Sequence, residues 1–126
     1  MNKKLIDAVN DQLGGDEEEN KQTMKDVCAH GADAGFPGFI YYSDTVKFFD
    51  ENKDAILEEV KEMASSLGED ALQMIAGFVC LKDAKFSTTE IAEAVYGNLK
   101  GDDAVSIKNA LAWFALEEVS RFVCES

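Results

Sequence analysis

Apolar residues recur at intervals of three and four along almost the whole chain, which is the spacing of an α-helix with one buried face. The first such segment carries Leu5, Val9 and Leu13, and it stops at Gly14-Gly15, where a left-handed helix cap is favoured. Strand-like alternation is confined to one short stretch, which has no convincing partner strand. The pattern predicts an all-α domain of about six helices.

The acidic run Asp16–Glu19 would stand in the first turn of a second helix, where the positive end of the helix dipole stabilises carboxylates. Met24, Val27 and Cys28 would form the buried stripe of this helix, and Gly31 would end it.

Residues 43–67 contain two amphipathic segments in succession. Ser43 or Asp44 can cap the first, which carries Phe48 and Phe49, and the second ends before Gly68. The following segment, 71–81, is apolar nearly all round, with Gln73 as its polar interruption. We therefore expect this helix at the centre of the domain.

Two start signals mark the C-terminal helices. Ser87 and Glu90 have the spacing of a capping box, which predicts a helix running toward Gly97. Asp102 or Asp103 can cap a long last helix. Its apolar face includes Val105, Ile107, Leu111, Phe114, Val119 and Phe122, and its solvated side carries Glu117, Glu118 and Arg121.

The length of 126 residues and a hydrophobic content of 46% are sufficient for one core without metals or disulfides, so we expect a single domain over residues 1–126. The N-terminus lacks the pattern of a signal peptide, and no run of 18 apolar residues is present. Cys28, Cys80 and Cys124 stand among apolar residues. We interpret them as reduced core thiols of a cytoplasmic protein.

Acidic residues number 25 against 12 basic ones, giving a formal net charge of -13. Such a surface repels phosphate, so direct binding of nucleic acid is not expected. The charge is explained either by solubility alone or by recognition of a basic partner.

The sequence contains no motif that is diagnostic of an enzymatic reaction. We therefore predict neither enzymatic activity nor a cofactor. Cys28 and His30 are the only close Cys/His pair, and a structural zinc site needs four ligands, so no metal site is predicted. Residues two apart on a helix point in different directions, which also disfavours a nucleophile and base pair. A partly buried or capping role for His30 is the simpler interpretation.

Residues 86–114 resemble the helix-turn-helix layout of small regulators, in which a motif such as STTEIA opens the first helix. A reading helix brings basic or amide side chains to the bases, whereas only Lys100, Lys108 and Asn109 qualify here. A small transcriptional regulator is therefore an alternative, as is a structural protein that self-associates.

The acidic face between residues 50 and 70 is the first candidate for partner binding. It carries eight acidic residues against two lysines. Carboxylates at helical spacing can imitate a row of phosphates and attract a basic channel, although an ordinary solvated face explains them too. The candidate residues are Asp50, Glu51, Asp54, Glu58, Glu59 and Glu62.

The stretch 32–42 holds the only proline and is the one clearly non-helical segment, with or without a short strand. We expect a loop docked on the core. Its aromatic residues either complete the core or anchor an interface, because rigid rings bury much area at little entropic cost. The candidates are Phe36, Phe39, Tyr41 and Tyr42.

The motifs GFPGFIYYSDTVKFF, SLGEDALQMIAGFVCLKD, EIAEAVYG and NALAWFALEEV resemble a family of small acidic proteins carried by bacteriophages, prophages and plasmids. The resemblance spans residues 35–120 and implies that residues 1–34 form a variable helical extension. It also implies a setting in which small acidic proteins inhibit host defence, as anti-CRISPR and anti-restriction proteins do. Together, the charge and this resemblance predict a noncatalytic inhibitor of a basic host protein, such as a CRISPR effector or another nuclease.

Overall fold

The computed structural model describes residues 1–31, 35–82, 86–97 and 100–125, with the side chains of residues 80–82 excepted. The described residues form helices and connecting segments without a strand. The all-α prediction is therefore confirmed. The helices are α1 (Lys3–Leu13), α2 (Glu17–His30), α3 (Tyr42–Leu67), α4 (Ala71–Lys82), α5 (Thr88–Tyr96) and α6 (Asp102–Glu125).

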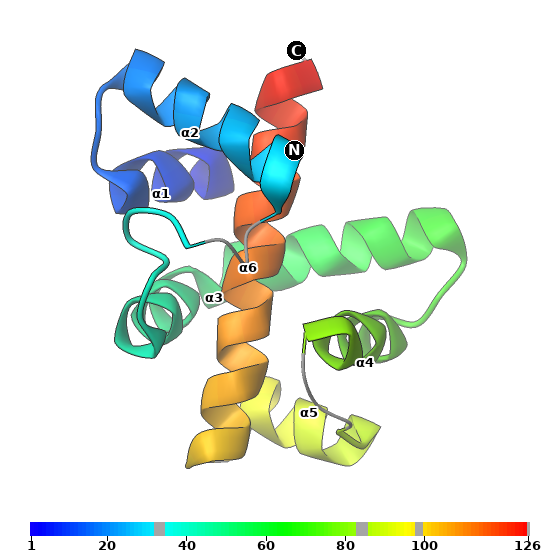
Figure 1. Cartoon of the computed structure of the whole chain (residues 1–126). Helices are drawn as coiled ribbons and strands as arrows, with labels where there is room; N and C mark the ends of the chain where they lie inside the picture. Colours follow the sequence, from blue (N-terminus) through cyan, green and yellow to red (C-terminus); the bar gives the residue numbers. More distant parts are fainter. Residues whose placement is uncertain (32–34, 83–85, 98–99, 126) are drawn as a thin grey trace.

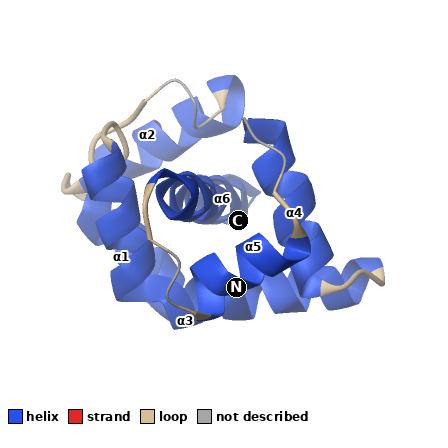
Figure 2. Cartoon of the chain, turned by 90° about the horizontal axis from the view of Figure 1, so that it is seen from below, coloured by secondary structure: helices blue, strands red, loops and turns tan. Residues whose placement is uncertain are grey.

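Helix α6 forms the axis of the molecule (Figure 1), and the other helices surround it when it is viewed nearly end-on (Figure 2). It contacts each of the five other helices. Small residues at positions 104, 110, 112 and 115 are buried and let neighbouring helices approach closely. Between them lie the larger buried residues Ile107, Leu111, Phe114, Leu116 and Val119.

The prediction that segment 71–81 lies at the centre is wrong. Among the described side chains of α4, only Ile75 and Val79 are buried, whereas Leu72, Met74 and Phe78 are half-buried at the edge of the core. Apolar character on every side indicates burial only when other elements cover every side. Here α4 packs against α3, α5 and α6, and its remaining surface faces outward.

The two N-terminal helices belong to the common core. Leu5, Val9 and Leu13 of α1 are buried, and α2 packs along α6. Gly14 has the expected left-handed conformation, with φ at 77°. Asp16 is the N-cap of α2 rather than part of its first turn, because its carboxylate accepts a hydrogen bond from the Glu19 N–H.

Helix α3 joins the two amphipathic segments that the sequence separates. It begins at Tyr42, and Tyr41 occupies the N-cap position without a side-chain hydrogen bond, so neither Ser43 nor Asp44 is the cap. The helix kinks at Asn52, whose φ of -122° and ψ of 19° are not helical. The Asn52 side-chain amide donates to the Phe48 carbonyl oxygen at 2.9 Å.

The start of α5 is as predicted, because Ser87 and Glu90 form a reciprocal capping box. Asp102 and Asp103 lie in the first turn of α6, where the helix dipole favours them. On the side of α6 expected to be solvated, Glu117 and Glu118 are half-buried. Across the described part of the chain, no helix combines the length and apolar character needed to cross a bilayer.

Candidate functional site

The loop before α3 divides its aromatic residues between the core and the surface. Phe39 is 1% exposed, and its ring meets that of Phe48 edge-on at 5.1 Å between centroids. Phe36 is half-buried against the same core. Tyr41 and Tyr42 are 68% and 59% exposed, and Ile40 is 60% exposed. Phe39 therefore packs in the core, and its prediction as a partner-binding residue is wrong. Residues 32–34 of the expected loop lie outside the described residues.

The loop is held against α1 through Gly38. The Gln12 side-chain amide donates a hydrogen bond of 2.8 Å to the Gly38 carbonyl oxygen. Gly38 has a φ of 79°, and a Cβ atom there would overlap the Gln12 carbonyl oxygen. The close approach of the two backbones thus requires glycine. The loop is thus fixed at Gly38, shortly before the exposed residues Ile40, Tyr41 and Tyr42.

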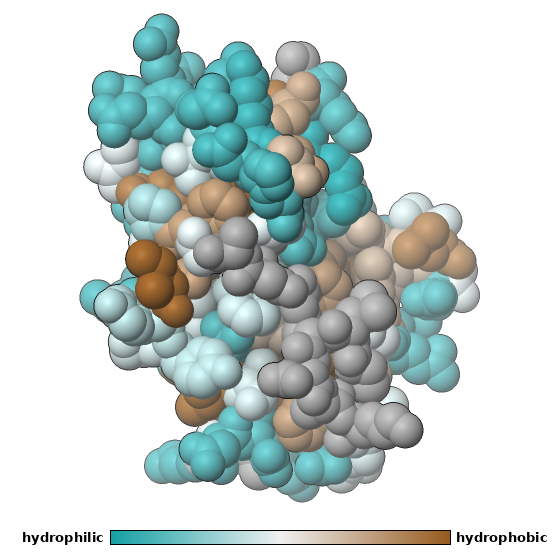
Figure 3. All heavy atoms as spheres, in the orientation of Figure 1, coloured by the Kyte–Doolittle hydropathy of each residue, from teal (hydrophilic) through white to brown (hydrophobic). Residues whose placement is uncertain are grey.

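One exposed aromatic residue, Tyr42, and the first acidic residues, Asp50 and Glu51, line the same hollow. It has a volume of about 520 Å³ and lies between the start of α3 and the start of α6. We call it the α3–α6 hollow. In the space-filling view, apolar residues reach the surface at the level of the loop, whereas the surface over α2 is mainly hydrophilic (Figure 3). The hollow is lined by Tyr42, Ser43, Val46, Lys47, Asp50, Glu51 and Val105.

The two carboxylates of the α3–α6 hollow are each paired with a lysine. Lys108 Nζ lies 2.9 Å from Asp50 Oδ1, and Lys47 Nζ lies 3.8 Å from Glu51 Oε1. The side chains of Asp50 and Glu51 are 51% and 57% exposed, so water screens both pairs. The carboxylates remain accessible to a competing cation from a partner.

The remaining acidic candidates form a shorter row than the sequence predicts. Asp54, Glu58 and Glu62 are exposed beyond the kink at Asn52, and Glu58 accepts a hydrogen bond of 3.2 Å from the Asn2 side chain. The kink places Asp50 and Glu51 on a separate helical segment. The row of carboxylates expected on this acidic face is therefore interrupted at Asn52.

Glu59 is buried and does not belong to the acidic surface. It is 8% exposed, and its Oε2 atom has no hydrogen-bond partner among the residues that the structure describes. Burial raises the pKa of its carboxyl group, and the neighbouring charge of Glu62 raises it further. A carboxylate in this position destabilises the fold instead of contacting a partner.

The side chains considered for reading DNA bases are mostly engaged within the fold. Asn109 is buried, and its side-chain oxygen accepts a hydrogen bond from the Thr45 hydroxyl. Lys108 is held by Asp50, while Lys100 is exposed. Of the three expected side chains, only Lys100 is therefore open to solvent, and it lies in the segment between α5 and α6.

The expectation of core thiols is wrong for two cysteines. Cys28 and Cys124 are both exposed, and Cys28 lies beside the buried stripe formed by Met24 and Val27. The Cys80 side chain lies outside the described set. His30 is exposed in the last turn of α2 rather than partly buried. Within the described ranges, no three His, Cys, Asp or Glu side chains are arranged to hold a metal ion.

The family described as "Domain of unknown function (DUF7222)" matches residues 2–125, so the chain belongs to this family over nearly its whole length. The match includes α1 and α2 together with the later helices. No curated protein and no solved structure matches the chain.

Proposed function

We propose that this member of the DUF7222 family is a noncatalytic binding protein that inhibits a basic, nucleic-acid-handling host-defence protein, such as a CRISPR effector or another nuclease. One observation carries the proposal: the exposed Tyr42 shares the α3–α6 hollow with Asp50 and Glu51, on a chain with a net charge of -13. We place the inhibitor in the cytoplasm, where such a partner acts, and assign it no cofactor.

The lining of the hollow suits an arginine or lysine side chain from the partner. Val46 and Val105 provide an apolar wall for the aliphatic stem, and the Tyr42 ring can stack on a guanidinium group. Asp50 and Glu51 provide carboxylates for the charged end. The same basic side chain would contact phosphate when the partner holds nucleic acid, so the two ligands would compete.

The exposed acids beyond the kink contribute at longer range. Asp54, Glu58 and Glu62 are accessible to solvent and add to the negative potential of the same helix. A group of negative charges increases the rate of association with a basic surface, and salt screens this effect. We therefore assign specificity to the α3–α6 hollow and the salt-dependent association rate to these three acids.

Self-association is the second candidate because Ile40, Tyr41 and Tyr42 form an exposed run. Rigid aromatic residues of this kind are effective anchors in homodimer interfaces as well as in mixed ones. A concentration-dependent mass in sedimentation equilibrium that is lost in a Tyr41→Ser/Tyr42→Ser variant would favour this candidate.

The inhibitor proposal is tested by quantitative capture of proteins from a host lysate that contains CRISPR and restriction complexes. The tagged chain is compared with Tyr41→Ser/Tyr42→Ser and with a charge-reversal variant, Asp54→Lys/Glu58→Lys/Glu62→Lys. The matched control reverses Asp7, Asp26 and Glu93, which are exposed acids on α1, α2 and α5. Both triple variants change the net charge equally.

The proposal predicts capture of a basic nuclease or surveillance-complex subunit that is reduced at least about tenfold by the tyrosine variant. Reversal of the α3 acids weakens capture more than reversal of the control acids, and added nucleic acid displaces the partner. The purified partner's nuclease activity falls when the wild-type chain is added. Equal capture by the wild-type chain and the tyrosine variant would contradict the proposal. Nuclease activity of the purified partner that is unchanged when the chain is added would contradict it as well.

A further inference from the structure

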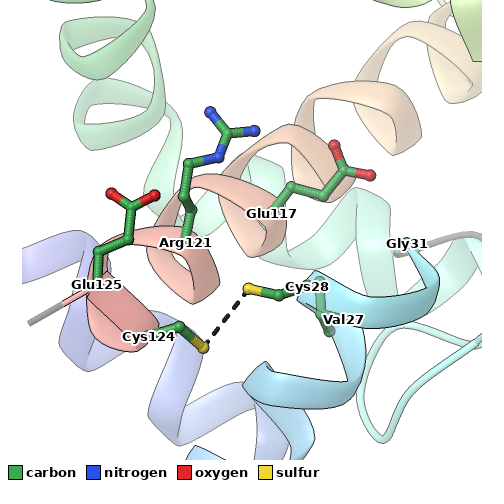
Figure 4. Close-up of a pocket in the computed structure, with 7 residues that line it drawn as sticks. All are labelled: Val27, Cys28, Gly31, Glu117, Arg121, Cys124 and Glu125. Carbon is green, nitrogen blue, oxygen red and sulfur yellow. Dashed lines mark hydrogen bonds between the residues drawn. The ribbon is translucent and has the colours of Figure 1, made fainter.

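Two cysteine sulfurs that lie far apart in the sequence are in contact at the end of the molecule where α2 and α6 meet. Cys28 belongs to the last turn of α2 and Cys124 to the last turn of α6. The Cys28 thiol donates a hydrogen bond to Cys124 Sγ, and the two sulfurs are 3.5 Å apart (Figure 4). A disulfide bond is about 2.05 Å long, so the sulfurs need to approach by about 1.5 Å to form one.

Small molecules can reach both sulfurs. Cys28 and Cys124 are exposed, and they face a hollow of about 450 Å³. The close-up shows the two thiols directed toward one another across this opening, with Arg121 and Glu117 on the α6 side (Figure 4). The site is therefore accessible to a small oxidant and to a reducing thiol.

Both cysteines lie next to helix ends, where small displacements are least restricted. Helix α2 ends at His30, two residues after Cys28, and α6 ends at Glu125, one residue after Cys124. Terminal helical turns carry carbonyl groups without intrahelical partners and adjust more easily than central turns. Movement of these two ends can close the remaining distance between the sulfurs without disturbing the buried part of α6.

We propose that Cys28 and Cys124 are an oxidative modification site at which a peroxide forms a reversible disulfide that links α2 to α6. The Cys124 thiolate attacks a peroxide oxygen, the O–O bond breaks, and hydroxide leaves as Cys124 becomes a sulfenic acid. The Cys28 thiolate then attacks Cys124 Sγ, and the S–O bond breaks with release of a second hydroxide. With the two thiol protons, the products are one disulfide and two waters; the sulfurs are oxidised and the peroxide is reduced.

The surroundings of Cys28 set the pH range of disulfide closure. Although Cys28 reaches the surface, partial burial of its thiol, the hydrogen bond to Cys124 and the negative charge of Glu125 together raise its pKa to about 11, and Arg121 opposes them. Glu117 lines the same hollow from α6. Cys28 is thus protonated near neutral pH, which suits the donor role seen in the structure. Disulfide closure accelerates as the pH rises toward 11, because the thiolate is the attacking species.

The test treats the reduced full-length chain with hydrogen peroxide and follows three quantities. Titration of free thiols should show a fall from three to one. Peptide mapping without reductant should identify a link between the Cys28 and Cys124 peptides. The melting temperature should rise by roughly 5–15 °C, because the disulfide joins residues 96 positions apart and closes a long loop, and it should return to its starting value with dithiothreitol.

Cys28→Ser and Cys124→Ser are the control variants, and both positions are exposed, so the fold is expected to persist in each. Neither variant should gain thermal stability with peroxide. Two results would overturn the proposal: a principal cross-link between two copies of the chain, or over-oxidation of either thiol without an intramolecular link. Because the readouts are chemical and thermal, they are independent of the proposed inhibitor function.

Discussion

Lys108 Nζ lies 2.9 Å from Asp50 Oδ1, and this ion pair joins the first half of α6 to the acidic rim of the α3–α6 hollow. The lysine side chain is 21% exposed, whereas that of Asp50 is 51% exposed. The carboxylate therefore has one side directed at Lys108 and another open to solvent. A partner cation must share or displace Lys108 in order to bind Asp50.

Replacing this lysine should strengthen binding of a basic partner. Lys108→Met keeps the aliphatic stem, removes the competing cation and makes the net charge more negative. The free energy of unfolding should change by less than about 1 kcal/mol, as is usual for a solvent-screened ion pair. Affinity should increase by a factor of about 3–10, as measured by calorimetry at low salt. Weaker binding by a stably folded Lys108→Met variant would show that Lys108 contacts the partner itself.

The position of the aromatic loop depends on Gly38. Gly38→Ala introduces a Cβ atom that overlaps the Gln12 carbonyl oxygen at a φ of 79°. We expect the free energy of unfolding to fall by about 1–3 kcal/mol and partner binding to be lost with the displaced loop. Urea denaturation measures the first effect. Gly35→Ala is the matched control because Gly35 also has a positive φ, but no atom of the described residues lies near the added Cβ. Equal losses in the two variants would mean that contact with Gln12 does not position the loop.

The buried pair Thr45 and Asn109 connects α3 to α6. Thr45→Val removes the hydroxyl that donates to the Asn109 side-chain oxygen and leaves a buried polar group unsatisfied. The expected loss in the free energy of unfolding is about 1–3 kcal/mol. The double variant Thr45→Val/Asn109→Leu should recover part of this loss, because both polar groups are then absent. Additive losses in the double variant would contradict an energetic coupling between the two residues.

Glu59 makes stability depend on pH with a predictable sign. Its pKa in the folded protein is raised above the ordinary value of 4.5, mainly by burial. The folded state therefore holds this proton more tightly than the unfolded chain does. Its stabilising contribution is fully present below pH 4.5 and is lost as the pH rises through the raised pKa.

Glu59→Gln removes the charge while keeping the shape of the side chain. The variant should be more stable than the wild-type chain by about 1 kcal/mol at pH 7, with little difference at pH 4. Thermal unfolding at a series of pH values measures this difference. Glu58→Gln, at an exposed neighbouring position, provides the control and should have little effect. A loss of stability at pH 7 in Glu59→Gln would show that the ionised carboxylate is favourably paired.

The sequence was sufficient to place helices where the signals are local. Gly14 ends α1 in a left-handed conformation, and Ser87 and Glu90 form their capping box within four residues of chain. Such contacts depend little on the rest of the fold. The central position of α6 depends instead on how all the helices pack. Its small buried residues, such as Ala112, are less conspicuous in a sequence than the continuous apolar run of α4.

The sequence identified individual residues of the candidate site but not which of them lie together. Tyr42 and Asp50 were identifiable as candidate residues, but their common hollow requires Val105 from a helix that begins sixty residues after Tyr42. Phe39 and Tyr41 have similar side chains two positions apart, and only packing shows that one is buried and the other exposed. The pairing of Cys28 with Cys124 likewise requires the arrangement of α2 against α6.

The most direct test of the central claim is an NMR titration of the isotope-labelled chain with an oligo-arginine peptide at low and high salt. We predict that the backbone amides that shift at low salt cluster around Tyr42, Val46, Asp50 and Val105, and that Tyr41→Ser/Tyr42→Ser weakens these shifts. High salt should reduce the affinity without moving the site. Shifts dispersed over all acidic helices, or confined to a surface away from the α3–α6 hollow, would contradict the claim that this hollow recognises a basic partner.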